Sequence, residues 1–475
     1  MIHRAILLSD KSVTIYKFKL IRRYVDVNGP FLKKYIFQAK LRYLLKATDE
    51  FENLKKVENL SVKQLKELNF KKRVDIVNNA YQHIPFYKAF YDTCNFNPIT
   101  LLNESDWSSV PVITKQLIKE NTQSIVNPNF KISDLRSSST GGSTGEPLKV
   151  FFDKKTPLEQ FGWRTLNWWG IEPWENQAYI YRNVRKGLGK IINTIKWWPT
   201  KRVLLDCSSM DVQDMDCFIA KINKIKPAFI QGYVGGVYDF AKYVNDNHIK
   251  LFAPKAIWVT AAPLSESTRL FIESALGAPV YDQYGCSEMF WLAAECKNKK
   301  GLHVLSDIRH IEFLDNNNNI VENGDFGDVV ITDLENIAFP LIRYKNGDSG
   351  RYLKNNCSCN LPYPLIDKIK GRVSDNIYTP SGINVNGAYL TTIFDRFPDL
   401  IESFQIIQKK DYSVVINCIL SKDISVNDGR FNKIKKELLL KTKKEIKIEF
   451  QFLDSLVQDR GKLKFVISEL EKVCD

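Results

Sequence analysis

Hydroxyl and glycine residues are concentrated in one short stretch, RSSSTGGSTGEPLKV, which runs from Arg136 to Val150. Its first ten residues hold four Ser, two Thr and three Gly. Glycines let successive backbone N–H groups converge on an anion, and hydroxyls add further donors. The stretch lacks the Gly-Lys-Ser/Thr ending of a Walker loop. Its composition alone therefore leaves two interpretations open, a flexible surface linker or a loop that wraps a phosphate chain.

Four later segments place charged residues at predicted turns or strand ends. YDQYGCSEM ends a predicted strand, FPLIRYKNGDSG puts an acid in a tight turn after a strand, and QDRGKLKFVIS presents a lysine on a turn before a strand. IKGRVSDNIY contains an arginine and an acid at the predicted boundary between two domains. The residues singled out in these segments are Tyr284, Gly285, Glu288, Asp348, Arg372, Asp375 and Lys462. Each is unremarkable alone, but their order along the chain is informative.

The elements that must position these residues follow an α/β pattern. The chain has 475 residues and 44% hydrophobic content, which predicts two or three domains. KAIWVTAAPL is typical of a buried strand, SESTRLFIESAL of a helix and APVYDQYG of the next strand, so a parallel sheet is expected. The pattern is helical from Lys63 to Asp92, and NNNNI predicts a turn between strands. The expected fold is a large multi-layer α/β domain with a late β-rich subdomain, followed by a small α+β domain with the order helix, strand, strand, helix, strand.

The order and separation of the charged segments resemble the adenylate-forming superfamily, most closely its phenylacetate–CoA ligase and CapK-type branch. The resemblance runs from about Gln64 to Ser468. It also rests on NNAYQHIPFYKAFYD, VPVITKQLIKEN, KPAFIQGYVGGVYDFAKYV, GLHVLSDIRHIEFLD and FGDVVITDLENIAFPLIRYKNGD. It implies a basic extension over residues 1–60, a large adenylation domain over 61–370 and a small mobile domain over 371–475.

The resemblance also implies a role for each matching residue. Thr140, Gly141, Gly142, Ser143, Thr144 and Gly145 form the mobile loop around the β- and γ-phosphates of ATP. Tyr284 stacks on adenine, with Gly285 and Ser287 of the same motif also in the nucleotide site, and Glu288 holds Mg²⁺. Asp348 accepts hydrogen bonds from the ribose hydroxyls, and Arg372 lies close by. Asp375 is the hinge, and Lys462 reaches from the small domain into the site. The chain departs from its relatives at Glu146, where many carry Lys, at Ser287, where Thr is usual, and at Lys345-Asn346, where Arg-Thr is common.

Cysteine and histidine residues suggest a metal site. Thiolate and imidazole are the usual ligands of tetrahedral Zn²⁺. The segment NNCSCNLP contains Cys357 and Cys359, and AAECKNKKGLH contains Cys296 and His303. The resemblance places the two segments near each other and predicts a structural zinc site. The alternative is a set of thiols without metal. Cys286, inside the adenine motif, is interpreted as a packing residue.

Charge and hydropathy restrict where the protein acts. The formal net charge is +14, and much of the excess lies in the first ~75 residues, where Lys and Arg alternate with aromatic and aliphatic residues. That mixture suits an anionic membrane surface, an acidic partner or a solvated helical face. No nucleic-acid motif accompanies it. The N-terminus does not resemble a signal peptide and no run approaches a membrane span. We therefore expect a cytoplasmic protein, in peripheral contact with the inner face of the membrane, whose nine Cys are reduced.

The leading hypothesis is an AMP-forming ligase that uses ATP and Mg²⁺ to activate a carboxylic acid. The acyl acceptor stays open between CoA, which would make an acyl- or aryl-CoA ligase, and an amine or hydroxyl in surface or capsular polysaccharide synthesis. A non-catalytic scaffold is a second class of function, opposed by the joint presence of Glu288, Asp348, Arg372, Asp375 and Lys462. Nucleic-acid binding rests on charge alone and would show steep salt dependence.

Overall fold

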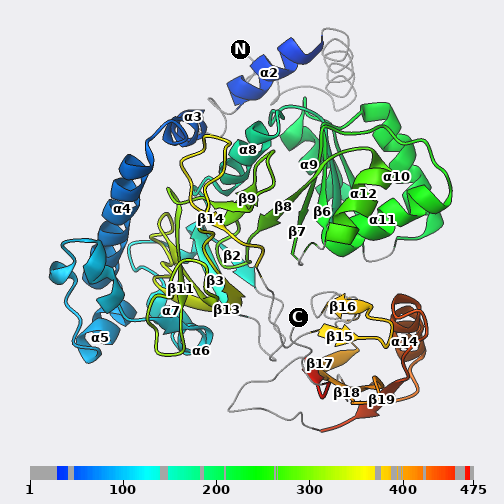
Figure 1. Ribbon diagram of the computed structural model, residues 1–475. Helices are drawn as coiled ribbons and strands as arrows, with labels where there is room; N and C mark the ends of the chain where they lie inside the picture. Colours follow the sequence, from blue (N-terminus) through cyan, green and yellow to red (C-terminus); the bar gives the residue numbers. More distant parts are fainter. Residues whose placement is uncertain are drawn as a thin grey trace. The chain divides into compact units, whose positions relative to one another are not determined.

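The protein is represented by a computed structural model (Figure 1). The structure describes residues 29–40, 48–139, 148–181, 187–207, 210–261, 264, 266–369, 376–386, 393, 397, 400–420, 424–454 and 466–470. These residues divide into two compact units. Unit one comprises the described residues of 1–58, 157–259 and 266–281, and unit two those of 59–156, 260–265 and 282–475. The division predicted from the sequence, 1–60, 61–370 and 371–475, stays a prediction.

Unit one is built on strands in the order β7-β6-β4-β5. Strand β4 pairs in parallel with both β5 and β6, and β4, β6 and β7 bury four of their five residues, as strands covered on both faces do. The strands are β4 (Gln177–Tyr181), β5 (Arg202–Asp206), β6 (Phe229–Tyr233) and β7 (Ala256–Thr260). The helices are α2 (Gly29–Lys40), α3 (Thr48–Val57), α8 (Leu158–Trp168), α9 (Gly187–Trp197), α10 (Val212–Ile225), α11 (Val234–Asp246) and α12 (Glu266–Leu276). The predicted strand–helix–strand run through β7, α12 and β8 (Val280–Tyr284) is confirmed.

Unit two begins with helices. Helix α4 (Val62–His83) starts at a capping box formed by Ser61 and Gln64, and α5 (Pro85–Thr93) follows it after a single residue. The helical pattern predicted from Lys63 to Asp92 is confirmed, with one interruption at Ile84. This residue is extended, because a proline inside a helix lacks the N–H donor and clashes with the preceding turn. Shorter helices follow at α6 (Lys115–Glu120) and α7 (Thr122–Ile125), with 3₁₀ turns η2 (Pro98–Thr100), η3 (Glu104–Ser109) and η4 (Ile132–Asp134).

Three sets of paired strands carry or flank the residues of interest. One is a sheet with the order β1-β13-β12-β11, the second is the run of strands β14-β10-β9-β8, and the third is the antiparallel hairpin of β2 and β3. Their bounds are β1 (Ile113–Thr114), β2 (Leu135–Ser139), β3 (Lys149–Asp153), β9 (Ala293–Glu295), β10 (Leu302–Val304), β11 (Arg309–Leu314), β12 (Gly327–Asp333), β13 (Tyr344–Gly350) and β14 (Leu365–Ile366). The NNNNI turn between β11 and β12 is confirmed. Asp315 accepts hydrogen bonds there from the backbone N–H groups of Asn317 and Asn319.

The C-terminal elements of unit two form an α+β arrangement with its own apolar core. The sheet order is β19-β18-β17-β20, and helix α14 connects the parallel strands β18 and β19. The elements are β15 (Asn376–Tyr378), β16 (Asn384–Asn386), β17 (Ile401–Gln408), β18 (Val414–Leu420), α14 (Gly429–Lys441), β19 (Ile448–Phe452) and β20 (Val466–Ser468). The mixed α/β fold class is therefore confirmed. The first predicted helix, in VNGAYLTTIFDRF, falls largely on residues outside those described.

Candidate nucleotide site and metal cluster

The residues predicted to bind nucleotide fall into two sets. The first set is described and lies in unit two: Tyr284, Gly285, Ser287, Glu288 and Asp348. The predicted residues outside the described part of the chain are Thr140, Gly141, Gly142, Ser143, Thr144, Gly145, Arg372, Asp375 and Lys462.

The hairpin of β2 and β3 bears on the glycine-rich loop. Ser139 and Lys149 are paired across the hairpin, so both ends of the segment 140–147 are held on neighbouring strands of one unit. Residues 140–147 themselves lie outside the described part of the chain, so the phosphate-binding role of the loop stays a prediction.

Tyr284 and Asp348 form a hydrogen-bonded group with Asn346, which the sequence marks only as a departure from the relatives and not as a site residue. The Tyr284 hydroxyl donates to Asp348 Oδ2 at 2.7 Å. The side-chain amide of Asn346 donates to the same carboxylate oxygen and to the Tyr284 hydroxyl, each at 2.8 Å. Burial, and then the neighbouring carboxylate charge, raises the pKa of Tyr284 well above its ordinary value, so the hydroxyl stays protonated and donating. The group thus fixes the carboxylate of Asp348 in one orientation.

Asp348 lies within a strand, not in the turn predicted from Gly347. Strand β13 continues to Gly350, and its pairing with β12 shifts register between Asp328 and Val330. Such a bulge rotates side chains away from simple alternation. The Asn346 side chain accepts a hydrogen bond from the Asp348 N–H at 3.0 Å, which stabilises this local geometry. The prediction of a turn was wrong because a glycine with a positive φ, here Gly347 at +92°, occurs in strand bulges as well as in turns.

Glu288 is buried and paired with a second unpredicted residue. The carboxylate is only 6% exposed, and the hydroxyl of Tyr344 donates to its Oε1 at 2.9 Å. Tyr344 opens strand β13, so one strand supplies groups that orient both predicted acids, Glu288 and Asp348. A carboxylate held in one orientation is a suitable ligand for a hard cation, so the geometry of Glu288 is compatible with the role predicted for it with Mg²⁺.

The turn that carries Glu288 has a close backbone approach at Gly285. A Cβ atom there would lie 1.9 Å from the carbonyl oxygen of Phe290, so only glycine fits. Arg309 holds the other end of the turn, donating from Nη2 to the carbonyl of Met289 and from Nη1 to Asp333, both at 2.6 Å. Burial, followed by the charges of the two nearby acids, raises the pKa of Cys286 well above its ordinary value. A thiol in that state is a poor nucleophile, which agrees with its interpretation as a packing residue.

Strand β13 is itself anchored by a buried ion pair. The guanidinium of Arg343 donates to both carboxylate oxygens of Glu312, at 3.0 and 3.1 Å, and to the carbonyls of Ser108 and Val110. Arg343 has a positive φ of 47° and is almost fully buried. The four hydrogen bonds of this side chain stabilise the strained backbone conformation of Arg343. No sequence pattern distinguishes such an arginine from an exposed one.

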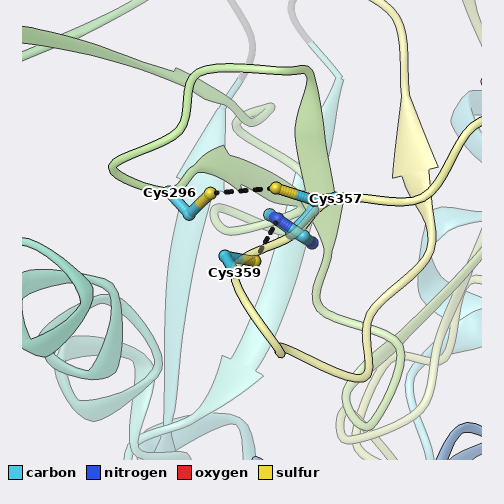
Figure 2. A group of neighbouring side chains, drawn as sticks. Cys296, Cys357 and Cys359 are labelled. Carbon is cyan, nitrogen blue, oxygen red and sulfur yellow. Dashed lines mark hydrogen bonds between the residues drawn. The ribbon is translucent and has the colours of Figure 1, made fainter.

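The four predicted zinc ligands come together in unit two. Cys296 directly follows β9, His303 lies in β10, and Cys357 and Cys359 lie in the segment before β14. Because β10 pairs with both β9 and β14, the sheet itself brings the three segments together. The sulfurs of the three cysteines converge (Figure 2). Cys296 and Cys357 are 3.6 Å apart, Cys359 is 3.2 Å from His303 Nε2, and all four ligand atoms lie within 4.8 Å of one another.

These distances suit a tetrahedral ion. Zn–S bonds of about 2.3 Å require sulfur atoms about 3.8 Å apart. The other ring nitrogen of His303 lies 3.1 Å from the carbonyl of Tyr363, which fixes the tautomer whose Nε2 lone pair faces the cysteines. Burial lowers the pKa of His303 and so favours the neutral imidazole that a metal binds.

None of the helices in the described part of the chain is long and apolar enough to cross a membrane.

Comparison with known proteins supplies the family. Residues 377–469 match the family model of the CapK C-terminal domain. Protein CapK of Staphylococcus aureus is 26% identical over 453 residues, which cover 91% of this chain and 94% of that protein. A phenylacetate–coenzyme A ligase of Thermus thermophilus is 24% identical over 373 residues, which cover 75% of this chain and 80% of that protein.

A solved structure agrees with these matches. A 2-hydroxyisobutyryl-CoA ligase in complex with 2-HIB-AMP and CoA has a TM-score of 0.59 at 19% identity, and the match covers 87% of this chain and 91% of that one. At this identity the likeness establishes a shared fold. The sequence relatives, which match over most of the chain, place its similarity with the phenylacetate–CoA ligases and the CapK-type proteins of the adenylate-forming ligases.

Proposed function

We propose that the protein activates a carboxylic acid as an acyl-AMP and passes the acyl group to an acceptor used in surface polysaccharide synthesis. The observation that carries the proposal is the pair of oriented acids, Asp348 held by Tyr284 and Asn346, and Glu288 held by Tyr344. A non-catalytic scaffold would have no need for two buried or half-buried carboxylates, each fixed by its own hydrogen-bond donor.

In the proposed reaction a carboxylate oxygen of the substrate attacks the α-phosphorus of ATP. The bond from that phosphorus to the oxygen bridging the β-phosphorus breaks, and pyrophosphate leaves with the electron pair. Mg²⁺ held by Glu288 would supply charge neutralisation for the phosphates. Asp348 would accept hydrogen bonds from the ribose hydroxyls, with Arg372 nearby, while Tyr284, beside Gly285 and Ser287, would present its ring to the adenine. Lys462 would stabilise the transition state, the loop from Thr140 to Gly145 would bind the phosphates, and Asp375 would act as the hinge.

The acceptor distinguishes two versions of the function. Attack on the acyl-AMP by an amine or hydroxyl, with AMP leaving, would give an amide or ester of a sugar. The resemblance to CapK-type proteins is the reason for placing this version first. Attack by the thiol of CoA would give a thioester, and the matches to phenylacetate–coenzyme A ligases support that alternative. ATP and CoA are cytoplasmic metabolites, so we place either reaction in the cytoplasm, with peripheral membrane contact through the basic N-terminal region.

Pyrophosphate release tests the proposal. The protein would be mixed with ATP, Mg²⁺ and a panel of aryl acids, amino acids and uronic acids, with and without CoA. We expect release with one class of acid and loss of release in Lys462→Ala. Turnover that requires CoA would favour the thioester version, whereas turnover that ignores CoA and responds to an amine or sugar would favour the first. Calorimetric absence of ATP binding would contradict both.

We also propose that Cys296, His303, Cys357 and Cys359 bind one structural Zn²⁺. A closed set of three sulfurs and one nitrogen leaves no open position for substrate, as in structural sites. The role would be to hold the segment before β14 against β9 and β10. Metal analysis of protein purified without chelator should give one zinc per chain, and a metal-free protein of unchanged stability would contradict the proposal.

A further inference from the structure

Helices α2 and α9 of unit one touch each other at their C-terminal ends. The ammonium group of Lys40, at the end of α2, donates to the carbonyls of Lys196 and Trp198 at 2.6 Å, and to that of Ile195 at 3.3 Å. Carbonyls at a helix end lack partners within the helix, so this lysine caps α9. The ring of Phe37 packs against Trp163 at 5.5 Å. One side of α2 is thereby attached to unit one.

The other side of each helix exposes large apolar residues. On α2, Phe31 is 70% exposed and Tyr35 54%, and their rings contact each other at 4.6 Å. On α9, Ile191, Ile192 and Ile195 are each more than half exposed. Phe31 and Tyr35 are four residues apart, and Ile195 is three and four residues after the other two isoleucines, so the exposed side chains of each helix lie on or beside one face. By contrast, α12 and α14 each expose a single large apolar residue among those described, Leu270 and Leu440.

The same two helices are purely basic. Helix α2 contains three lysines and α9 contains two, and neither contains Asp or Glu. Lys34 and Lys196 are exposed beside the apolar residues, and Glu159 of α8 reaches Lys196 at 3.6 Å. Exposed Phe, Tyr and Ile with lysines at the edges are the composition of helices that lie in a membrane interface, with apolar groups among the acyl chains and ammonium groups at the phosphates.

We infer that the outward faces of α2 and α9 form the surface by which this protein binds an anionic lipid bilayer. A second copy of the chain is the weaker occupant, because two faces rich in lysine would repel each other and lysine is depleted in protein interfaces. The residues that precede α2 in sequence include Lys17, Lys19, Arg22 and Arg23, so the sequence ahead of this helix is also basic. This surface assigns the proposed membrane contact to named residues, and its binding to lipid does not depend on the ligase activity.

Sedimentation with vesicles tests the inference on the full-length protein. Vesicles of phosphatidylglycerol mixed with phosphatidylcholine would be compared with vesicles of phosphatidylcholine alone. We expect binding to the anionic vesicles that weakens as salt rises. The triple variant Phe31→Ser, Ile191→Ser, Ile195→Ser should lose at least about tenfold in partition coefficient, since each buried apolar side chain contributes substantially. Lys34→Gln with Lys196→Gln should lose severalfold on anionic vesicles only.

Matched controls make the result decisive. Leu270→Ser with Leu440→Ser removes exposed apolar residues elsewhere, and Lys433→Gln with Lys436→Gln removes exposed lysines of α14, so both should bind as the parent does. Thermal unfolding and vesicle-free pyrophosphate release separate a folding or ligase defect from a membrane defect. Equal binding by the triple variant and the parent, or no binding by the parent, would overturn the inference. So would a parent dimer that the triple variant converts to a monomer, because the face would then be a contact between copies.

Discussion

The two polar clusters of unit two are organised in opposite ways. Around Tyr284, Asp348 and Asn346 the polar groups satisfy one another, donor to acceptor, at 2.7–2.8 Å. In the cysteine cluster four ligand atoms face a common point, and the contacts between them are weak hydrogen bonds of thiols. The first cluster is complete as protein alone, whereas the second gains most of its interaction energy only when an ion binds.

This difference teaches how each cluster relates to stability. A network that is complete without ligand holds its shape while nucleotide enters and leaves, as a catalytic site requires. A cluster that needs an ion couples metal binding to folding. Substitutions in the first should therefore change activity, and substitutions in the second should change stability.

The largest effect is expected from Cys357→Ser with Cys359→Ser. Two ligands would be lost, zinc content should fall from one per chain to none, and the free energy of unfolding should fall by more than about 4 kcal/mol. Urea unfolding with metal analysis measures both. Cys94→Ser and Cys217→Ser change exposed cysteines outside the cluster and should have no such effect. If the double variant unfolded at the same urea concentration as the parent, the cysteine cluster would not contribute to stability and the prediction would be wrong.

Glu288→Gln should show the complementary behaviour. The amide keeps the shape of the side chain and can still accept from Tyr344, but it loses the charge that would hold Mg²⁺. We expect acid-dependent pyrophosphate release to fall by about 100- to 1,000-fold, with the free energy of unfolding changed by less than about 1 kcal/mol. Release assays over a range of Mg²⁺ concentrations provide the measurement. Full activity in this variant would remove Glu288 from the metal role.

Residues with a role at a backbone motif were easier to predict than residues that support them. Gly285, Glu288 and Asp348 lie in short motifs whose order along the chain is visible in the sequence. The four metal ligands could be predicted because Cys and His are the usual residue types that bind zinc. Asn346, Tyr344, Arg309 and Arg343 act through contacts with residues that are distant in sequence, such as Glu312 and Met289. Those contacts depend on how β8, β11 and β13 pack, which periodicity does not reveal. Similarly, a strand bulge at Asp348 and a helix break at Ile84 arise from single residues within otherwise regular patterns.

Tyr344→Phe tests whether a supporting residue can be separated from the acid it orients. Removing one hydroxyl leaves the ring in place but leaves Glu288 Oε1 without this donor. We expect the Mg²⁺ concentration for half-maximal pyrophosphate release to rise about tenfold, with little change at saturating Mg²⁺. Tyr352→Phe is the matched control, since its hydroxyl donates to the carbonyl of Ile311 instead. If the two variants behaved alike, Tyr344 would have a packing role only.

The smallest effect concerns the anchor of strand β13 and depends on pH. His310 packs edge-to-face on Trp107 at 5.6 Å, and burial, followed by the charges of Arg73 and Arg343, lowers its pKa well below the ordinary value. A histidine whose pKa is depressed by folding contributes stability above its unfolded pKa and loses it as pH falls, because the unfolded chain then binds the extra proton. As the pH falls from 7 to about 5.5, this group should lower the free energy of unfolding by about 1 kcal/mol.

His310→Gln should remove that part of the acid sensitivity, while His248→Gln, at an exposed position, should leave it in place. Because the zinc ligands also take up protons in acid, the difference between these two variants, measured by urea unfolding at both pH values, isolates the strand anchor from the metal cluster. Equal acid sensitivity in the two variants would show that the anchor of β13 does not limit stability in acid.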